Sequence, residues 1–387
     1  MRLFESVFLC SVALAVINVV IAQTLGSGPV IKRPQSLEPK LDRSKQLVKY
    51  RYKDPKERPK IIVFGDSVSD TGNFYGMYQF GGYWNDGHFT NGPIWSEYYS
   101  TLVDYQLVNY AFAGAVINDS LSDPIPIWDF LPSVQQQIDI YINEKNGPKV
   151  STDITTTKDL DVAIIATACN DLFRMIRKIE KGIIDQTEFI TGIANTITTQ
   201  AELLISDPGG LMVVIWNWMP TELTMSETHK HYQIAKTSTN MFNQILNSWY
   251  QSLSPPSKKA NVIIADLWNF YHKVTNPRIL NALGIDFVDE KCLYTFGIHI
   301  PAESCAEPDK HLFYDYAHFS TKIHQVIGAY LVNLVKKNQL GNDDYELTEL
   351  ELLRIIEEFD IAAINSTHNI FSNSDPGRVF NAFSSHI

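Results

Sequence analysis

One pattern in the middle of the chain limits its possible folds more than any other. Five short apolar runs alternate with longer segments in which apolar residues recur at helical spacing. The runs are residues 60–64, 106–112, 161–167, 211–216 and 261–265. Strands that alternate with helices form a parallel sheet covered on both faces. The pattern therefore predicts an α/β fold, a three-layer α/β/α sandwich around a mostly parallel five-stranded sheet.

The helices between and after these runs are predicted from the same periodicity. They are residues 94–102, 134–143, 172–205, 232–252 and 321–337. The third is long, and we expect two helices broken near Gly192, because glycine weakens a helix interior. In the acidic tail, apolar residues recur at helical spacing and predict one amphipathic helix. They are Leu347, Leu350, Leu353 and Ile356. Residues after about 364 are rich in Ser and Asn, and we expect them to be loose.

The first residues indicate the compartment. Arg2 precedes an apolar stretch at residues 8–22, and a signal peptidase would cut before Gln23. The alternative is a membrane anchor, but 15 residues are too short to span a bilayer comfortably. We therefore predict a signal peptide and a secreted protein. Two sequons, at Asn118 and Asn365, are candidate glycosylation sites in a secreted chain.

Composition and charge divide the chain into four parts: a signal peptide (1–22), a basic polar linker (23–59), one domain (60–340) and an acidic extension (341–387). The formal charges of the two tails cancel, so residues 61–338 carry the net charge of −11 with 18 basic and 29 acidic residues. Such a surface argues against a nucleic-acid partner and suits a neutral substrate better than an anionic lipid surface. No later segment approaches a membrane span, so we expect no stable membrane insertion.

The four cysteines are too few for a disulfide framework. Cys10 lies in the predicted signal peptide and is removed with it. Cys292 and Cys305 lie close in sequence, and in an oxidising compartment we expect them to form a disulfide. Cys169 is then left over, and we expect a buried, inert thiol.

Two segments could supply a nucleophile and its base. Ser67 follows the first apolar run, with Gly65 allowing a tight exit from the strand, and His318 follows Asp315 by three residues. A carboxylate at that spacing can orient an imidazole as a base for a serine. The competing interpretations are a helix N-cap for Ser67 or Asp66 and a surface ion pair for the histidine.

Two other strand ends offer oxyanion donors, the backbone N–H of Gly114 and the side-chain amide of Asn170, beside the N–H of Ser67. Alternatively, Gly114 only turns the chain and Asn170 only caps a helix. Other polar residues nearby are expected to hold loops through side-chain to backbone hydrogen bonds: Asp66, Asp70, Asn73 and Asp171.

Three of the ten histidines could suggest a metal site: His229, His231 and His311. No carboxylate or cysteine spacing matches them, so no metal is predicted.

The four blocks together resemble those of the GDSL, or SGNH, family of serine esterases and lipases over residues 61–337. Gly65-Asp66-Ser67-Val68 resembles the first block, with Val68 in place of leucine. The resemblance implies a flavodoxin-like fold and a triad of Ser67, Asp315 and His318. It also implies an oxyanion hole of Ser67, Gly114 and Asn170. The third block departs from the family pattern, because Ala168 replaces its glycine, and we expect slight crowding there.

Residues 87–95 resemble the segment after the first block in secreted fungal and plant members of the family. Residues 132–138 and the Cys292…Cys305 pair before Asp315 are similar to carbohydrate esterase family 16. This similarity implies an extracellular acetylesterase of plant cell-wall sugars that needs no metal or organic cofactor. Trp84 or Trp216 could form a platform on which a sugar ring stacks; the alternative for either is a core position.

The leading functional hypothesis is a secreted serine esterase whose substrate is a small-molecule or oligosaccharide ester, with acetyl esters of carbohydrate favoured. The alternative is an extracellular GDSL lipase or lysophospholipase on the same scaffold, which would need an apolar acyl groove. A third reading is a non-catalytic carbohydrate-binding protein, against which all four block residues argue. Oligomeric state does not follow from the sequence.

Overall fold

The structure is a computed structural model that describes residues 58–78, 87–125, 131–146, 160–206, 210–224, 230–294, 304–342, 345–363 and 379–381. Several predictions lie outside these residues: the signal peptide, nearly all of the basic linker, Trp84 and the Asn365 sequon.

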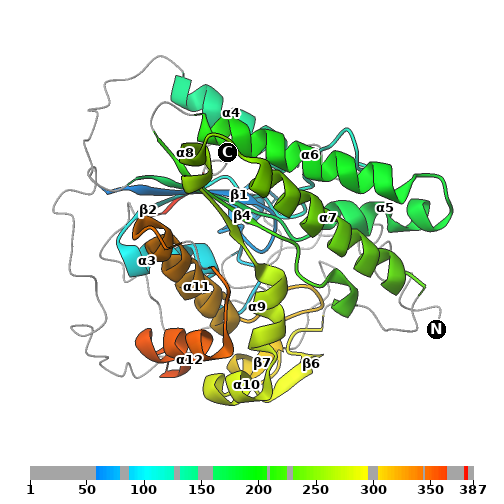
Figure 1. Ribbon diagram of the computed structural model, residues 1–387. Coiled ribbons are helices and arrows are strands. Elements are labelled where there is room, and N and C mark those ends of the chain that lie inside the picture. The colour runs from blue at the N-terminus through cyan, green and yellow to red at the C-terminus, as the bar shows by residue number, and fades with distance from the viewer. Residues whose placement is uncertain are drawn as a thin grey trace, which may run out of the picture.

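A parallel sheet at the centre of the molecule contains all five predicted strands (Figure 1). They are β1 (Lys60–Gly65), β2 (Gln106–Asn109), β3 (Val162–Ala166), β4 (Met212–Trp216) and β5 (Val262–Ala265). Their order is β5-β4-β3-β1-β2, and every pairing is parallel. This is the order of flavodoxin-like sheets, which bind ligands at the carboxyl ends of the strands. The three-layer α/β/α fold and its parallel sheet are confirmed.

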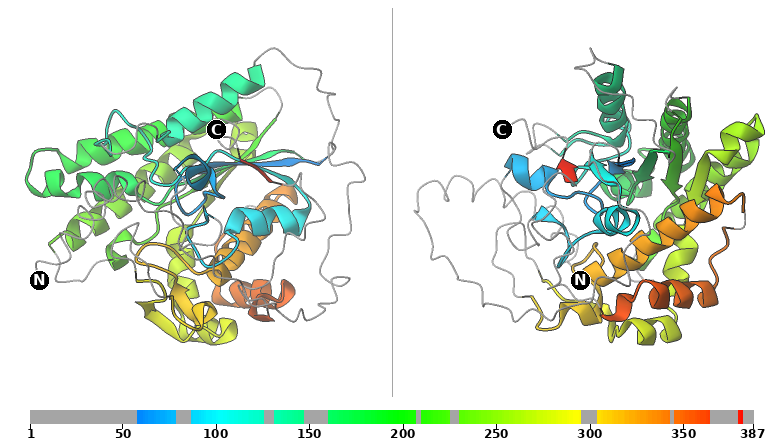
Figure 2. Two further views of the ribbon diagram at one scale, coloured as in Figure 1. Left: turned by 180° about the vertical axis from the view of Figure 1, so that it is seen from behind. Right: turned by 90° about the vertical axis from the view of Figure 1, so that its left-hand side faces the viewer.

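A sixth strand, which the sequence did not predict, extends the sheet. β8 (Val379–Asn381) runs parallel to β2, with Leu107 opposite Val379, and is the short red segment in Figures 1 and 2. It comes from the Ser- and Asn-rich tail that was expected to be loose. Three residues are too few for a visible alternation of apolar and polar side chains, so periodicity could not reveal this strand.

Successive residues of each strand point to opposite faces and build two separate cores. Ile61 and Val63 pack on one face, with Leu107 and Ile164, whereas Ile62 and Phe64 pack on the other. The first face is covered by α3 (Trp95–Val103), α9 (Leu267–Val274), α10 (Pro277–Leu283), α11 (Thr321–Gln339) and α12 (Glu349–Glu358). The second is covered by α4 (Val134–Asn146), α5 (Asn170–Glu180), α6 (Gln186–Ile205) and α7 (Tyr232–Ser252). Two short helices, α2 (Asn73–Tyr78) and α8 (Pro256–Ala260), complete the connections.

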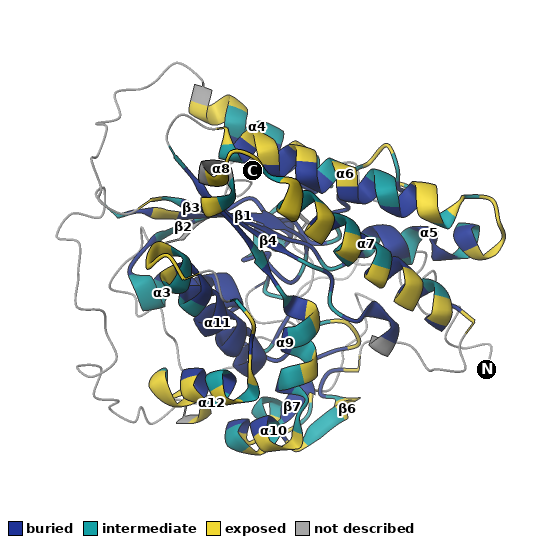
Figure 3. Cartoon of the chain, in the orientation of Figure 1, coloured by how far each residue is buried: buried dark blue, intermediate teal, exposed yellow. Residues whose placement is uncertain are grey.

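α11 is the most deeply buried helix on its face and appears mostly dark blue in Figure 3. Its contact with α3 depends on Gly328, where an added Cβ would lie 2.7 Å from the carbonyl oxygen of Trp95. Glycine therefore allows the two helix backbones to approach closely. Because α11 begins at Thr321, this packing fixes the position of the chain that leads into it from His318.

The predicted break in the long helix near Gly192 is wrong. The break lies between α5 and α6, where Gly182 adopts a left-handed φ of +64° and Asp185 caps the next helix by accepting the N–H of Glu188 at 2.8 Å. Gly192 lies inside α6, where an added Cβ would lie 3.1 Å from Cδ1 of Leu121. That glycine serves close packing rather than a turn.

The amphipathic helix of the acidic tail exists as α12, but its buried face differs from the predicted one. Leu352, Ile355 and Ile356 are buried, whereas Leu350 is 65% exposed. A repeat of three residues alone drifts around a helix that has 3.6 residues per turn. The buried stripe instead combines spacings of three and four, so it leaves Leu350 outside.

A small two-stranded sheet precedes α11, formed by β6 (Phe287–Lys291) and β7 (His311–Phe313). The predicted disulfide between Cys292 and Cys305 is confirmed and closes the chain between these strands. Cys169 is free and buried, as expected. None of the helices in the described part of the chain is long and apolar enough to cross a bilayer.

Candidate active site

Ser67 lies at the carboxyl end of β1, on a turn closed by a 3.0 Å hydrogen bond from the N–H of Ser69 to the carbonyl of Asp66. The turn lifts Ser67 off the strand and leaves it half-buried. Gly65 is needed just before it, because an added Cβ would lie 2.2 Å from the carbonyl oxygen of Ala166 on β3. The strand can therefore pass close to its neighbour and deliver the serine to the ligand-binding edge of the sheet.

His318 lies on a hairpin that follows β7. Phe313 and Phe319 pair across its base, and the N–H of Tyr314 donates to the carbonyl of His318 at 2.8 Å. Inside the turn, Oδ1 of Asp315 accepts the N–H groups of Ala317 and His318 at 2.8 and 2.9 Å. The carboxylate thus shapes the loop whose histidine it also contacts.

The three side chains form a continuous chain of hydrogen bonds. Nε2 of His318 lies 2.8 Å from Oγ of Ser67, and Nδ1 lies 2.8 Å from both carboxylate oxygens of Asp315. Burial lowers the pKa of His318, but the charge and hydrogen bond of Asp315 outweigh it, so the net pKa lies above its ordinary value. The imidazole is thus placed to take a proton from the serine and to be stabilised when charged.

Hydrogen-bond donors gather at the ends of the neighbouring strands. Gly114 follows β2 with a left-handed φ of +79°, and its carbonyl accepts from Arg174. Its N–H has no partner among the described residues, and neither has the N–H of Ser67. Asn170 begins α5 and donates one amide proton to the carbonyl of Ala115 at 2.9 Å. Its second amide proton is left for a ligand.

Ala168, at the departure from the family's third block, does not adopt a left-handed backbone conformation. The left-handed φ of 58° falls on Cys169 instead. The N–H of Ala168 donates to Oδ2 of Asp66 at 2.6 Å. Glycine is therefore not required at 168 by the local backbone, and the turn that presents Asn170 forms with alanine.

Three buried carboxylates hold the loops around Ser67, as expected. Asp66 joins the first strand end to Ala168, and Asp171 accepts the N–H of Ile117 at 2.8 Å. Asp70 accepts four backbone N–H groups at 2.7–3.1 Å; they belong to Gly72, Asn73, Phe74 and Ala113. Burial raises the pKa of each carboxyl group to about 6, against the lowering effect of these hydrogen bonds.

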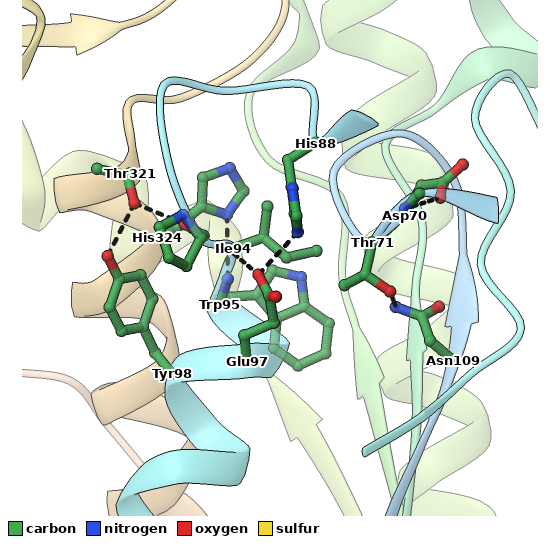
Figure 4. A network of polar contacts seen from close by, with 12 residues as sticks. Asp70, Thr71, His88, Ile94, Trp95, Glu97, Tyr98, Asn109, Thr321 and His324 are labelled. Carbon is green, nitrogen blue, oxygen red and sulfur yellow. Dashed lines mark hydrogen bonds and ion pairs between the residues drawn. The ribbon is translucent and has the colours of Figure 1, made fainter. Parts of the chain in front are cut away.

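Asn73 completes this support by donating to the carbonyls of Asn109 and Ala111 at 3.0 and 2.9 Å. Asn109 in turn donates to the carbonyl of Ser69 at 2.7 Å. It also donates to Oγ1 of Thr71 at 3.0 Å, as the right-hand part of Figure 4 shows. The loops after β1 and β2 are therefore joined by buried side chains.

Residues 89–91 contact the histidine hairpin and the start of α11 directly, and no sequence pattern predicted these contacts. The Phe89 ring lies 5.3 Å from the His318 ring, centroid to centroid. Oγ1 of Thr90 donates to the carbonyl of Phe319 at 2.7 Å, and Oδ1 of Asn91 accepts the N–H of Thr321 at 2.8 Å. The similarity of residues 87–95 to a known segment was the available signal, but it carried no role for individual residues.

A polar network anchors this segment to α3 and α11 (Figure 4). Oε2 of Glu97 lies 3.1 Å from Nε2 of His88 and accepts the N–H of Ile94 at 2.8 Å. Nδ1 of His324 lies 3.4 Å from the backbone N of Trp95, which donates to it. Burial, with smaller effects from His318 and His88, lowers the pKa of His324 to about 3, so this histidine is neutral.

Gln137, in the segment 132–138, was also missed as a support. Its amide accepts the N–H of Gly65 at 2.8 Å and donates to the carbonyl of Gly65 at 2.9 Å. The last residue of β1 is thereby held from α4 on both of its backbone polar groups.

The prediction that Trp216 forms a sugar platform is wrong. Its side chain is 2% exposed and packs against Trp95, with ring centroids 4.9 Å apart. Trp216 ends a strand in the middle of the sheet, where α3 and α11 cover that face. A tryptophan at a strand end looks the same in sequence whether it faces a ligand or a helix.

The remaining predictions concern glycans and metals. Asn118 is half-buried, and its Nδ2, to which a glycan would attach, donates to Oγ1 of Thr196 at 3.2 Å. Among the described residues, one group of possible metal-ligand atoms comes together: Cys292, Cys305 and His311. Both sulfurs are in the disulfide and therefore are not thiolate ligands.

The family model described as GDSL-like Lipase/Acylhydrolase matches residues 61–331, and the chain belongs to this family. It is accordingly an enzyme that hydrolyses ester bonds. A curated relative is the thermolabile hemolysin of Vibrio parahaemolyticus serotype O3:K6 (strain RIMD 2210633), 38% identical over 65 residues. That match covers 16% of this chain and 16% of the hemolysin.

Two solved structures are also similar. The lipase Lip_vut3 from a goat rumen metagenome is 13% identical, with a TM-score of 0.37, over 74% of this chain and 100% of that one. The acetyl xylan esterase AlAXEase is 15% identical, with a TM-score of 0.35, over 71% and 99%.

Proposed function

We propose that this chain is a secreted serine esterase that hydrolyses acetyl esters of carbohydrate, with Ser67, His318 and Asp315 as its catalytic triad. The observation that carries the catalytic part is the unbroken series of 2.8 Å contacts from Oγ of Ser67 through the imidazole to the carboxylate. Buried supports hold both ends of this series, so the groups need little rearrangement before reaction.

In the first half of the reaction, Oγ of Ser67 attacks the ester carbonyl carbon while its proton passes to Nε2 of His318. The tetrahedral intermediate collapses when His318 gives that proton to the leaving alkoxide, which departs as a sugar hydroxyl. Water then attacks the acetyl-serine, again losing a proton to His318. Acetate leaves, and the proton returns to Ser67.

The negative charge of each tetrahedral intermediate needs preformed donors. The N–H groups of Ser67 and Gly114 and the second amide proton of Asn170 supply them, from the adjacent ends of β1, β2 and β3. In a site sheltered from water, each such donor contributes about 10²–10³-fold to the rate.

Sequence similarity and charge favour acetylated carbohydrate as the substrate. Residues 132–138 and the Cys292…Cys305 pair are similar to features of carbohydrate esterase family 16. The acidic domain suits a neutral substrate better than a phospholipid surface. The disulfide and the predicted signal peptide are both consistent with secretion. A lipid acyl hydrolase is the second candidate, favoured by the family description, GDSL-like Lipase/Acylhydrolase.

The catalytic assignment is tested with Ser67→Ala, with Ser252→Ala at the exposed last residue of α7 as a matched control. We expect Ser67→Ala to lower kcat by about 10⁴-fold or more with an unchanged melting temperature, and the control to behave as the wild type. Ester hydrolysis by Ser67→Ala at the wild-type rate would refute the nucleophile.

The substrate assignment is tested with p-nitrophenyl esters of increasing acyl length and with acetylated xylo-oligosaccharides beside phosphatidylcholine vesicles. We expect kcat/KM to fall from acetate to octanoate, and the xylo-oligosaccharides to be deacetylated. A rise in kcat/KM from acetate to octanoate, with hydrolysis of the phospholipid, would contradict the acetylesterase assignment and support the lipase.

A further inference from the structure

Two tyrosine side chains are exposed to solvent on or next to the hairpin that carries His318. Tyr294 is 47% exposed and Tyr316 is 43% exposed. In the described part of the chain, Trp268 is the one other aromatic residue with a comparably exposed side chain. Large exposed rings close to a reacting group indicate a binding surface more often than rings scattered elsewhere on a protein.

Tyr316 lies within the turn that shapes the triad. It stands between Asp315 and Ala317 at the outer corner, because Oδ1 of Asp315 accepts the N–H groups of Ala317 and His318 from inside the turn. Its Cα is two residues from that of His318 and therefore at most about 7.6 Å away. The backbone that carries this ring is therefore anchored close to the site of reaction.

Tyr294 is held against Tyr316 by the fold rather than by chance. The preceding Leu293 donates its N–H to the carbonyl of Tyr314 at 2.6 Å, and Cys292 is fixed by its disulfide to Cys305. The two ring centroids lie 6.1 Å apart, with the planes at 86°. The rings thus form a preformed right-angled corner, which costs a ligand little ordering on binding.

The chemistry of the corner suits a neutral sugar. One ring offers a face to the C–H groups of a pyranose, and the other ring forms a side wall. The phenol hydroxyls have no hydrogen-bond partner among the described residues, so they can bind sugar hydroxyls. The surrounding domain is acidic, with 29 acidic against 18 basic residues, which disfavours a phosphate headgroup.

We infer that Tyr294 and Tyr316 form a substrate-binding subsite that stacks the sugar ring of the alcohol part of the ester beside His318. This inference rests on the proposed function and specifies where its substrate binds. The two residues bind and orient the substrate; they donate no group to the reaction.

The test compares two acetyl esters that differ in the alcohol: acetylated xylo-oligosaccharide and ethyl acetate, which has no ring to stack. Tyr294→Ala and Tyr316→Ala are each expected to raise KM for the oligosaccharide about tenfold, the effect of losing one good apolar contact. Their kcat/KM for ethyl acetate should stay within about twofold of the wild type.

Tyr316→Phe keeps the ring and should fall between the wild type and Tyr316→Ala. Leu340→Ala, at an 85% exposed position at the far end of α11, is the control and should change neither substrate. Melting temperatures establish that each variant is folded.

Equal losses on both esters, or an unchanged KM for the oligosaccharide, would overturn the subsite. So would losses seen with phosphatidylcholine vesicles alone, because the rings would then contact lipid. If the wild type deacetylates the oligosaccharide and the variants match it, only the subsite is wrong. If the wild type does not deacetylate the oligosaccharide, the proposed substrate is wrong as well.

Discussion

The two sides of the Ser67–His318 contact are supported in very different ways. Ser67 stands at the end of a central strand, and the carboxylates that hold its surroundings are themselves buried beneath the sheet edge. His318 stands on a hairpin outside the main sheet, held by one disulfide and by Thr90 and Asn91. The serine is placed at the end of a central strand, whereas the histidine lies on a hairpin whose base, at Leu312 and Phe319, packs in the core and whose turn depends on polar and covalent ties.

This difference means that the two sides should respond differently to mutation. Loss of a support beneath the serine should lower the stability of the whole domain, because the core depends on it. Loss of a support beneath the histidine should lower activity or local stability first, while the sheet remains folded.

The largest effect is expected from Asp315→Asn, which removes the charge beside His318 and weakens the turn. We expect kcat to fall by roughly 10³–10⁴-fold with the main sheet intact by circular dichroism. A kcat within tenfold of the wild type would contradict the role of Asp315.

The pH profile sharpens the same comparison. His318 must be neutral to accept the serine proton, and Asp315 raises its pKa above the ordinary value. The acid limb of kcat/KM should therefore have its midpoint above about 6.5, with activity lost as pH falls. In Asp315→Asn the midpoint of the residual activity should move to lower pH; an unmoved midpoint would assign the limb to another group.

Loss of the disulfide should separate the two sides in stability. The double variant Cys292→Ser/Cys305→Ser opens a loop whose ends are 13 residues apart in sequence. In the chain-entropy account, a disulfide that closes such a loop stabilises the folded state by about 3 kcal/mol. We expect activity to disappear on heating well before the loss of helix signal. Reductant should do the same to the wild type and nothing more to the double variant. Coincident loss of activity and structure in the variant would show that the hairpin and sheet unfold together.

On the serine side, Asp70→Asn leaves an amide facing backbone N–H groups that the carboxylate had accepted. We expect a loss of about 2–3 kcal/mol in the free energy of unfolding, measured in urea. The matched control is Asp123→Asn, whose half-exposed ion pair with Lys178 should be worth less than about 1 kcal/mol. Equal effects from the two variants would remove the distinction between a buried and a surface carboxylate.

The smallest effect is expected from Asn91→Ala on the histidine side. It loses the bond to the N–H of Thr321 and one from Nδ2 to Asp309 at 3.1 Å. We expect kcat to fall roughly fivefold, as for a displaced base, with KM for ethyl acetate unchanged. A change in KM alone would place Asn91 in substrate binding instead.

Much of the fold could be predicted because burial on both faces makes parallel strands nearly continuous apolar runs. All five runs became strands: β1 is one residue longer than its run, and the other four are shorter at one or both ends. Features that depend on contact rather than periodicity were not predicted. β8 pairs through its backbone, and the choice between Gly182 and Gly192 depended on where Leu121 packs.

The positions of the site residues could be predicted in part for a similar reason. Ser67, Gly114 and Asn170 each follow a strand, and parallel strands bring such residues to one edge. Trp216 follows the same rule and is nevertheless buried, because helices cover that strand end. The support from Phe89 and Asn91 spans more than 220 residues of sequence, and no local pattern encodes such a contact.

The pairing of β8 with β2 has a consequence for solubility. β8 occupies the backbone N–H and C=O groups of Leu107 and Asn109 that would otherwise face outward from the rim of the sheet. A row of unpaired strand groups is a template on which another chain can add, and aggregation starts from such edges. A protein shortened before Val379 would keep its triad yet expose that row, so it should self-associate at concentrations at which the full chain remains dispersed.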